Sequence, residues 1–160
     1  MSIPGVLPSA NIKWFQAQAA CKNARKRLPS NAEWQGAAAG TNTGPDDHVS
    51  TCNTDAGVGA NTVPTGSRAS CVSTDLAFDM VGNLSEWVAD WMPRSNSCPG
   101  WGSFSDDFMC LAPGASVGPG PGALFRGGDW TSGTGAGVYA VVGVFDPLPA
   151  TNYIGFRCAR

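Results

Sequence analysis

The chain has 160 residues, of which 42% are hydrophobic, and this is enough for one domain with a packed core. Only 14% are charged, and the 21 glycines and 12 prolines favour a loop-rich fold with short strands over long surface helices. The net charge of −2 and the lack of a long basic run exclude an extended nucleic-acid surface, and no stretch is apolar for long enough to span a membrane.

A first helix is expected close to the N-terminus. Asn11 can cap a helix over residues 12–26, because Trp14, Ala17, Cys21 and Ala24 recur at helical spacing and would form its buried stripe. The basic end of this helix, residues 22–27, is typical of a solvated helix terminus, where cations suit the helix dipole.

A second helix is expected directly after the first. Ser30 and Glu33 have the spacing of a capping box, in which each residue's side chain accepts from the other's backbone N–H. The helix would stop at Gly40. Its core-facing residues would be Trp34, Ala37 and Ala38.

For the rest of the chain the sequence predicts loops with a few short strands. Residues 41–74 are rich in small polar residues and include His48, which we expect to be an exposed loop residue. Trp87, Ala89 and Trp91 alternate like a strand packed against the core. Residues 93–110 form another loop, 124–130 a short strand with a bulge, and 154–160 a terminal strand.

The six cysteines contain no CxxC pair, so a zinc site is not expected. Cys52 with Cys71, and Cys98 with Cys110, each bracket a loop that burial could not hold, which favours a disulfide across each loop. Disulfides indicate an extracellular or virion setting, or a thermophile with oxidised intracellular proteins. The first residues lack the charged and apolar regions of a signal peptide, which argues against simple secretion.

Three separated motifs carry a family resemblance. They are KRLPSNAEWQGAAAG at residues 26–40, FDMVGNLSEWVADW at 78–91, and FRGGDW with IGFRCAR near the C-terminus. In this order they resemble the formylglycine-generating-enzyme, or sulfatase-modifying factor, family. The resemblance implies one C-type-lectin-like α+β domain over residues 1–160, with two helices around short, twisted antiparallel strands. It also implies a disulfide between Cys21 and Cys158.

Enzymes of this family hold catalytic cysteines between the GG-W strand and GFR. Here that segment, residues 131–153, contains no Cys, His, Lys, Arg or Glu. Tyr139, Asp146 and Tyr153 are its only candidates for chemistry, and each is more simply a surface residue. We therefore assign no catalytic residue, and a formylglycine-generating-type oxidase stays the alternative function.

Some members of the family bind structural calcium around a VGN-x-x-E turn. Here the backbone carbonyls of Val81, Gly82 and Leu84, with the Glu86 carboxylate, could supply oxygen ligands. The alternative is that Glu86 pairs with a nearby arginine or caps backbone amides. Neither interpretation requires a cofactor for activity, and the calcium would be structural.

The C-terminal segment has a closer resemblance. Residues 126–160 are similar to the variable region of the proteins that diversity-generating retroelements mutate at template adenines, typically in AAC codons. Such codons cannot yield Lys, Glu, Gln, Met or Trp, and none of these occurs at 131–153. The shared framework positions are Arg126, Gly127, Gly128, Trp130, Gly133, Ala136, Gly137, Ala140, Pro147, Ile154, Gly155, Phe156 and Arg157.

This resemblance implies a non-catalytic, ligand-binding protein that displays a variable surface on a stable scaffold anchored by Trp130 and Phe156. Its unknown ligand, a protein or another surface, would differ between variants, and we expect a monomer that binds no nucleic acid and is displayed on a cell or virion surface. The alternative is an ordinary core segment in which Val142, Val144 and Phe145 are buried. The expected variable face comprises Asp129, Thr131, Ser132, Gly135, Tyr139, Val142, Val144, Phe145, Leu148, Pro149 and Tyr153.

Overall fold

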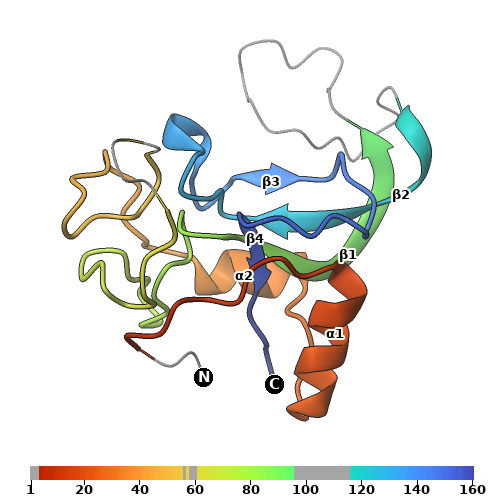
Figure 1. Cartoon of the computed structure of the whole chain (residues 1–160), viewed down its shortest axis with the longest axis horizontal. Coiled ribbons are helices and arrows are strands. Elements are labelled where there is room, and N and C mark those ends of the chain that lie inside the picture. The colour runs from red at the N-terminus through yellow and green to blue at the C-terminus, as the bar shows by residue number, and fades with distance from the viewer. Residues whose placement is uncertain (1–3, 56, 58–60, 96–115) are drawn as a thin grey trace.

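The computed structural model describes residues 4–55, 57, 61–95 and 116–160 and has an α+β fold (Figure 1). Two helices, α1 (Trp14–Asn23) and α2 (Asn31–Ala37), precede the strands β1 (Ser85–Ser95), β2 (Ser116–Arg126), β3 (Val141–Val142) and β4 (Ile154–Phe156). The sheet order is β3-β2-β1-β4. The expected two-helix fold is confirmed, and the sheet is mixed because β4 runs parallel to β1 while the other pairs are antiparallel.

Helix α1 is shorter than the sequence indicated. Lys13 occupies the N-cap position, and the expected cap, Asn11, instead adopts φ 57° and donates its backbone N–H to the Thr151 carbonyl at 2.8 Å. The helix ends early because Arg25 turns the backbone to φ 56°. As a result Ala24 is exposed, which corrects its expected place in the buried stripe.

The capping box of α2 is confirmed. The Ser30 hydroxyl accepts from the Glu33 backbone N–H at 3.2 Å, and the Glu33 carboxylate accepts from the Ser30 N–H at 2.8 Å. Arg27 also donates to Glu33 at 2.6 Å, and this bond, together with that from Ser30, lowers the pKa of Glu33 to about 2. The start of α2 is therefore fixed by local bonds that the sequence predicts.

Successive residues of a strand point to opposite faces of the sheet, and β1 and β2 contribute buried side chains on both faces. Helix α1 packs on one face and α2 on the other. The first core cluster includes Trp14, Ala17, Cys21, Trp87 and Phe125, and the second includes Trp34, Ala38, Met80, Val88 and Leu124. Both core clusters, each built from distant parts of the sequence, thus pack against β2, the strand that leads into the expected variable region.

Strand β1 departs from the simple alternation that the sequence suggested. Its register against β2 shifts between Trp87 and Trp91, and Ala89 donates its N–H to the Pro29 carbonyl at 2.8 Å. Trp87 is fully buried, but Ala89 is exposed and Trp91 is 38% exposed. The expectation that all three pack inward is wrong for the last two, since an irregularity in a strand shifts which face its side chains reach.

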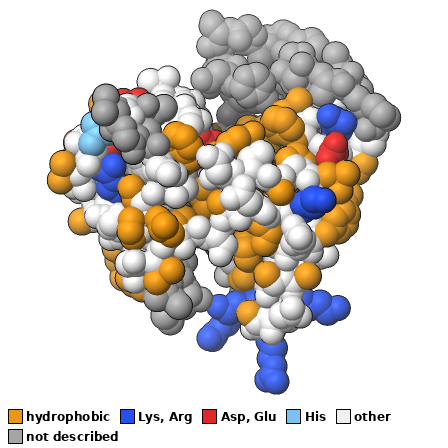
Figure 2. Space-filling view, viewed as in Figure 1, with side chains coloured by type: hydrophobic (Ala, Val, Ile, Leu, Met, Phe, Trp, Pro, Cys, Tyr) orange, Lys and Arg blue, Asp and Glu red, His pale blue; other side chains and the backbone are white. Residues whose placement is uncertain are grey.

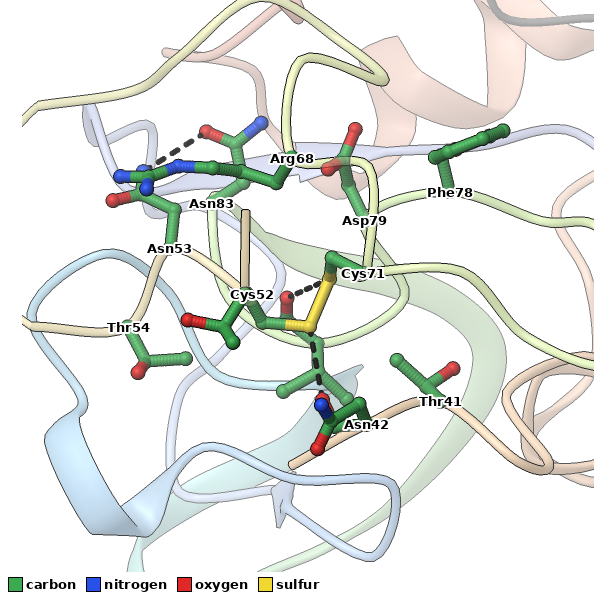
Figure 3. The surroundings of a disulfide bond; sticks show 12 residues. Thr41, Asn42, Cys52, Asn53, Thr54, Arg68, Cys71, Phe78, Asp79 and Asn83 are labelled. Atoms are coloured by element: carbon green, nitrogen blue, oxygen red, sulfur yellow. Dashed lines mark hydrogen bonds between the residues drawn. A yellow bond between two sulfur atoms is a disulfide. The ribbon is translucent and has the colours of Figure 1, made fainter. Parts of the chain in front are cut away.

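Two disulfides organise the long loops and the chain ends. Cys52 is joined to Cys71 within the loop of residues 41–74, which we call the irregular loop, close to Asn53 and Asn83 (Figure 3). Cys21 of α1 is joined to Cys158, just after β4. Both pairings are confirmed, whereas the expected pair Cys98–Cys110 lies outside the described residues. His48 is exposed, as expected.

Candidate ligand-binding surface

The expected variable region begins with a buried arginine that joins β2 to α2. Arg126 is 4% exposed, and its guanidinium lies 4.9 Å from the ring centroid of Trp34. It donates to the Val138 carbonyl at 3.0 Å and to the side-chain oxygen of Gln35. These contacts fix the point at which the segment leaves the sheet and also hold its middle, around Val138.

The two glycines after Arg126 are required by close packing. Gly127 and Gly128 have φ of 90° and 75°, in the left-handed region that disfavours other residues. A Cβ on Gly127 would lie 2.7 Å from the Met80 carbonyl oxygen, and one on Gly128 would lie 2.7 Å from Cα of Ala136. This explains why the framework contains the GG pair and a small residue at position 136.

The next two residues differ from expectation. Asp129 is 7% exposed, and its Oδ1 accepts from the backbone N–H and hydroxyl of Thr131 at 2.8 and 2.7 Å. It shapes the turn from inside, so its expected place on the displayed face is wrong. Trp130, expected to be a buried anchor, is only half-buried and lies outside the core clusters. The anchoring role falls instead to Arg126.

The other residues of the expected face are either exposed or half-buried. Val142 and Tyr153 pack against the first core cluster, and the ring of Phe145 stacks on Phe125 with centroids 5.8 Å apart. The core alternative is therefore partly right for this stretch. The exposed residues are Thr131, Gly135, Tyr139, Phe145 and Leu148, and the half-buried ones are Ser132, Val142, Val144, Pro149 and Tyr153.

The exposed residues form two groups, before and after β3 in the chain (Figure 1). The first group, on residues 131–139, lies beside the irregular loop, where Gly133 donates its N–H to the Thr54 carbonyl at 2.6 Å. The second, on residues 145–148, lies beside the start of α1, where Trp14 donates its N–H to the Pro147 carbonyl at 3.2 Å. Tyr139 is the most exposed large side chain of the first group, at 74%.

Two exposed aromatic residues adjoin the second group and were not predicted from the sequence. Phe15 is 50% exposed and Trp91 is 38% exposed, with their ring centroids 5.7 Å apart. Trp91 pairs across the sheet with Ala123, whose N–H donates to the Phe145 carbonyl at 3.0 Å. The sequence signal was weak: Phe15 stands beside the apolar stripe of α1, where a polar residue is usual. Exposed apolar side chains gathered in this way mark an interaction surface.

Glu86 does not offer a free carboxylate to calcium. Its Oε2 accepts from Trp34 Nε1 at 2.8 Å and from Arg157 Nε at 2.5 Å, and its Oε1 accepts from Arg157 Nη2 at 2.7 Å. Burial lowers the pKa of Arg157, but attraction to Glu86 outweighs it and the net shift is upward. Arginine pairing, the alternative drawn from the sequence, is what the structure shows for Glu86.

The described residues also bring together little that could perform chemistry. Every described cysteine is in a disulfide, and no three His, Cys, Asp or Glu residues of the described part are placed to hold a metal ion. Asp146 accepts from the Leu148 N–H at 2.9 Å, which is a local turn. Within these same ranges, no helix has the length and hydrophobicity needed to cross a membrane.

Known proteins share this architecture over nearly the whole chain. The sulfatase-modifying factor enzyme 1-like domain family matches residues 2–160. A curated relative, serine/threonine-protein kinase Pkn1 of Chlamydia trachomatis serovar L2, is 31% identical over 164 residues, which is 96% of this chain and 24% of the relative. The chain therefore spans about a quarter of that relative's length.

Solved structures show the same fold. The Major Tropism Determinant M1 variant superposes with a TM-score of 0.64 at 21% identity, covering 91% of this chain and 36% of the other. Treponema denticola variable protein 1 superposes with a TM-score of 0.65 at 22% identity, covering 97% and 71%. At this identity the likeness establishes the fold. The chain belongs to the family of sulfatase-modifying factor enzyme 1-like domains, and within that fold it resembles the variable proteins of diversity-generating retroelements.

Proposed function

We propose that this protein is a diversified, non-catalytic ligand-binding protein that displays a variable surface on a fixed scaffold. The observation that carries the proposal is the division of residues 126–160 into crowded and open positions. Several framework residues are buried or tightly packed, as at Arg126, Gly127, Gly128 and Ile154, although the framework residues Gly133 and Gly137 have open surroundings. Most of the residues between them are exposed or half-buried, and the side chains of the exposed ones can change at little cost to the fold.

Gly135 illustrates the open positions. A Cβ built on Gly135 would have no heavy atom within 4 Å, whereas one on Gly155 would lie 2.7 Å from the Ser9 carbonyl oxygen. Gly135 is one of the positions that the resemblance treats as diversified, and Gly155 belongs to the framework. Such a separation between stability and recognition is what loops on a rigid scaffold provide in antibodies.

The chemistry of the surface suggests a protein ligand. Tyr139, Phe145 and Leu148 are exposed, and Phe15 and Trp91 extend the second group with aromatic rings from outside the variable region. Aromatic side chains dominate the binding energy of many protein interfaces. We infer that the ligand differs between variants, in keeping with the names of the structural neighbours. We also infer that the protein binds this ligand as a monomer without nucleic acid and is displayed on a cell or virion surface.

A library experiment tests the proposal. One library randomises the five exposed positions, and a control library randomises five framework positions. Folding is read as resistance to protease, and binding is selected against a panel of unrelated surface proteins. We expect most of the first library to fold and to yield different binders for different targets, whereas the control library should be largely unfolded. Equal losses of folding in both libraries would contradict the proposal. The randomised positions are Thr131, Gly135, Tyr139, Phe145 and Leu148 in the first library, and Arg126, Gly127, Gly128, Ile154 and Gly155 in the second.

The formylglycine-generating oxidase is the competing function, since the family includes such enzymes. Incubation of the protein with a cysteine-containing sulfatase peptide, copper and oxygen should leave the mass of the peptide unchanged. Conversion of its cysteine to formylglycine would overturn the non-catalytic assignment. A genomic observation bears on diversification itself: we expect a nearby reverse-transcriptase gene and a near-copy of the coding segment that carries adenines where the two copies differ.

We also propose that folding requires no calcium, because the Glu86 carboxylate is bonded to Arg157 and Trp34. The thermal midpoint should be the same in excess calcium and in a chelator. A midpoint that rises with calcium concentration would place a calcium site in the protein and contradict this expectation.

A further inference from the structure

The cationic side chains are concentrated in the two terminal parts of the chain. Residues 1–32 and 147–160 contain no Asp or Glu, although the whole sequence has 12 of these and a net charge of −2. They do contain most of the cations, namely Lys13, Lys22, Arg25, Lys26, Arg27, Arg157 and Arg160. A protein with a negative net charge therefore has a positive portion.

The fold brings most of these cations to one end of the molecule. Arg27 and Ala159 exchange backbone hydrogen bonds at 3.0 and 2.8 Å, so Arg160 lies beside the residues that follow α1. Figure 2 shows Lys and Arg side chains gathered at the lower end of the view, where Figure 1 places the end of α1 and the C-terminus. Lys22, Arg25 and Arg160 are exposed, and no ion pair joins them to a carboxylate of the described residues.

A groove of about 550 Å³ opens at the same end. One wall is the N-terminal segment, in which Val6 and Leu7 are 52% and 58% exposed. The other wall is α1 with the chain after it, and the strand β4 contributes Phe156. This volume falls within the range of ligand pockets, about 300–1,000 Å³. We call it the basic groove and define it by Val6, Leu7, Ala20, Ala24, Lys26 and Phe156.

We infer that the basic groove binds an acidic peptide segment of another protein, with apolar side chains of the peptide in the groove and its carboxylates against Lys26 and the neighbouring cations. Two observations select this partner. The unpaired cations favour an anion, and the apolar side chains of Val6, Leu7 and Phe156 in a concave wall favour inserted side chains, which a flat anionic membrane or a nucleic-acid backbone lacks. None of the residues that line the groove belongs to β3 or to the expected variable face. One end of the molecule could then hold a carrier protein while the other presents the variable residues.

The test uses a labelled synthetic peptide in which glutamate alternates with leucine and alanine, titrated with the full chain by fluorescence anisotropy. A peptide with glutamine in place of glutamate is the first control. Lys26→Glu should weaken binding of the acidic peptide about tenfold or more, and more strongly at low salt. Lys13→Glu is the matched control, since it makes the same change of charge on an exposed residue at the opposite end of α1. It should change the affinity by less than about twofold.

A second variant separates groove binding from general attraction to anions. Ala24→Trp places a large ring at an exposed position in the groove wall and should also abolish peptide binding, while circular dichroism stays unchanged. Tyr139→Ser, on the variable face, should leave peptide binding intact. Failure of the peptide to bind, or equal effects of Lys13→Glu and Lys26→Glu, would overturn the inference. So would binding of phosphatidylglycerol vesicles or duplex DNA as tight as that of the peptide and unaffected by Ala24→Trp.

Discussion

Replacing Gly127 with alanine should destabilise the protein where the expected variable region leaves β2, and the structure gives the size of the effect. The residue has φ 90°, and holding alanine in the left-handed region costs about 1–2 kcal/mol. The new Cβ would also lie 2.7 Å from the Met80 carbonyl oxygen and 3.0 Å from Cζ2 of Trp34, and relieving such overpacking costs about 1–3 kcal/mol. We therefore expect Gly127→Ala to lower the free energy of unfolding by about 2–5 kcal/mol, or the thermal midpoint by about 4–20 °C.

Two other glycines of the same segment provide controls that separate the backbone cost from the overpacking cost. Gly133 has φ 54° but open space around a Cβ, so Gly133→Ala should show only the backbone cost of about 1–2 kcal/mol. Gly135 has neither constraint, so Gly135→Ala should be neutral or slightly stabilising, by up to about 1 kcal/mol. Denaturant unfolding followed by tryptophan fluorescence, with the disulfides intact, measures all three. If Gly127→Ala and Gly135→Ala differ by less than about 0.5 kcal/mol, the division into crowded and open positions is refuted.

Three further predictions concern other parts of the molecule. Tyr139→Ser should change the free energy of unfolding by less than about 0.5 kcal/mol, whereas Val142→Ser should cost about 1–3 kcal/mol because Val142 packs against the core; equal denaturation midpoints would contradict this. Replacing the Cys21–Cys158 pair by serine should cost about 3–5 kcal/mol, because this disulfide spans 137 residues of sequence, and unchanged unfolding in reductant would refute it. The backbone N–H of Thr51, the Ser50 hydroxyl and further N–H groups lower the pKa of Asp47, so its contribution to stability is present above about pH 4 and is lost as the pH falls. The amide protection factors of residues 45–55, which correct for the slower intrinsic exchange at acid pH, should therefore fall on acidification in the native protein but much less in Asp47→Asn, which keeps the Oδ1 acceptor.

Local chemistry made part of the fold predictable. The capping box of Ser30 and Glu33 acts within one turn, so its sequence spacing is sufficient evidence, and it is present. The Cys52–Cys71 disulfide was predictable because it closes a loop that is rich in small polar residues and that burial could not hold. The exposure of Trp91 was not predictable, because the register shift that turns its side chain outward depends on how β1 pairs with β2, which is a separate segment of the chain.

The candidate site was predictable in outline only. The framework resemblance located the segment, and the exposed large side chains of Tyr139, Phe145 and Leu148 do fall between framework residues. It could not reveal that Asp129 turns inward, because that orientation depends on bonds to Thr131 and Ser85 that exist only in the folded turn. Nor could it reveal the neighbouring rings of Phe15 and Trp91, since these come from other segments of the chain.

The parallel pairing of β4 with β1 has a consequence for the length of the expected variable region as well as for its sequence. The expected variable region begins at the end of β2, pairs with β2 again through β3, and ends in β4, and both β2 and β4 are hydrogen-bonded to β1. Its two ends are therefore separated by only two strand spacings, about 10 Å, and are tied further by the disulfide at Cys158. The entropy of closing a loop grows slowly with length, by about 0.6 kcal/mol for each doubling. Insertions at exposed positions such as Gly135 or Ala150 should consequently be tolerated almost as readily as substitutions, so the same scaffold can vary the reach of its binding loops and not only their side chains.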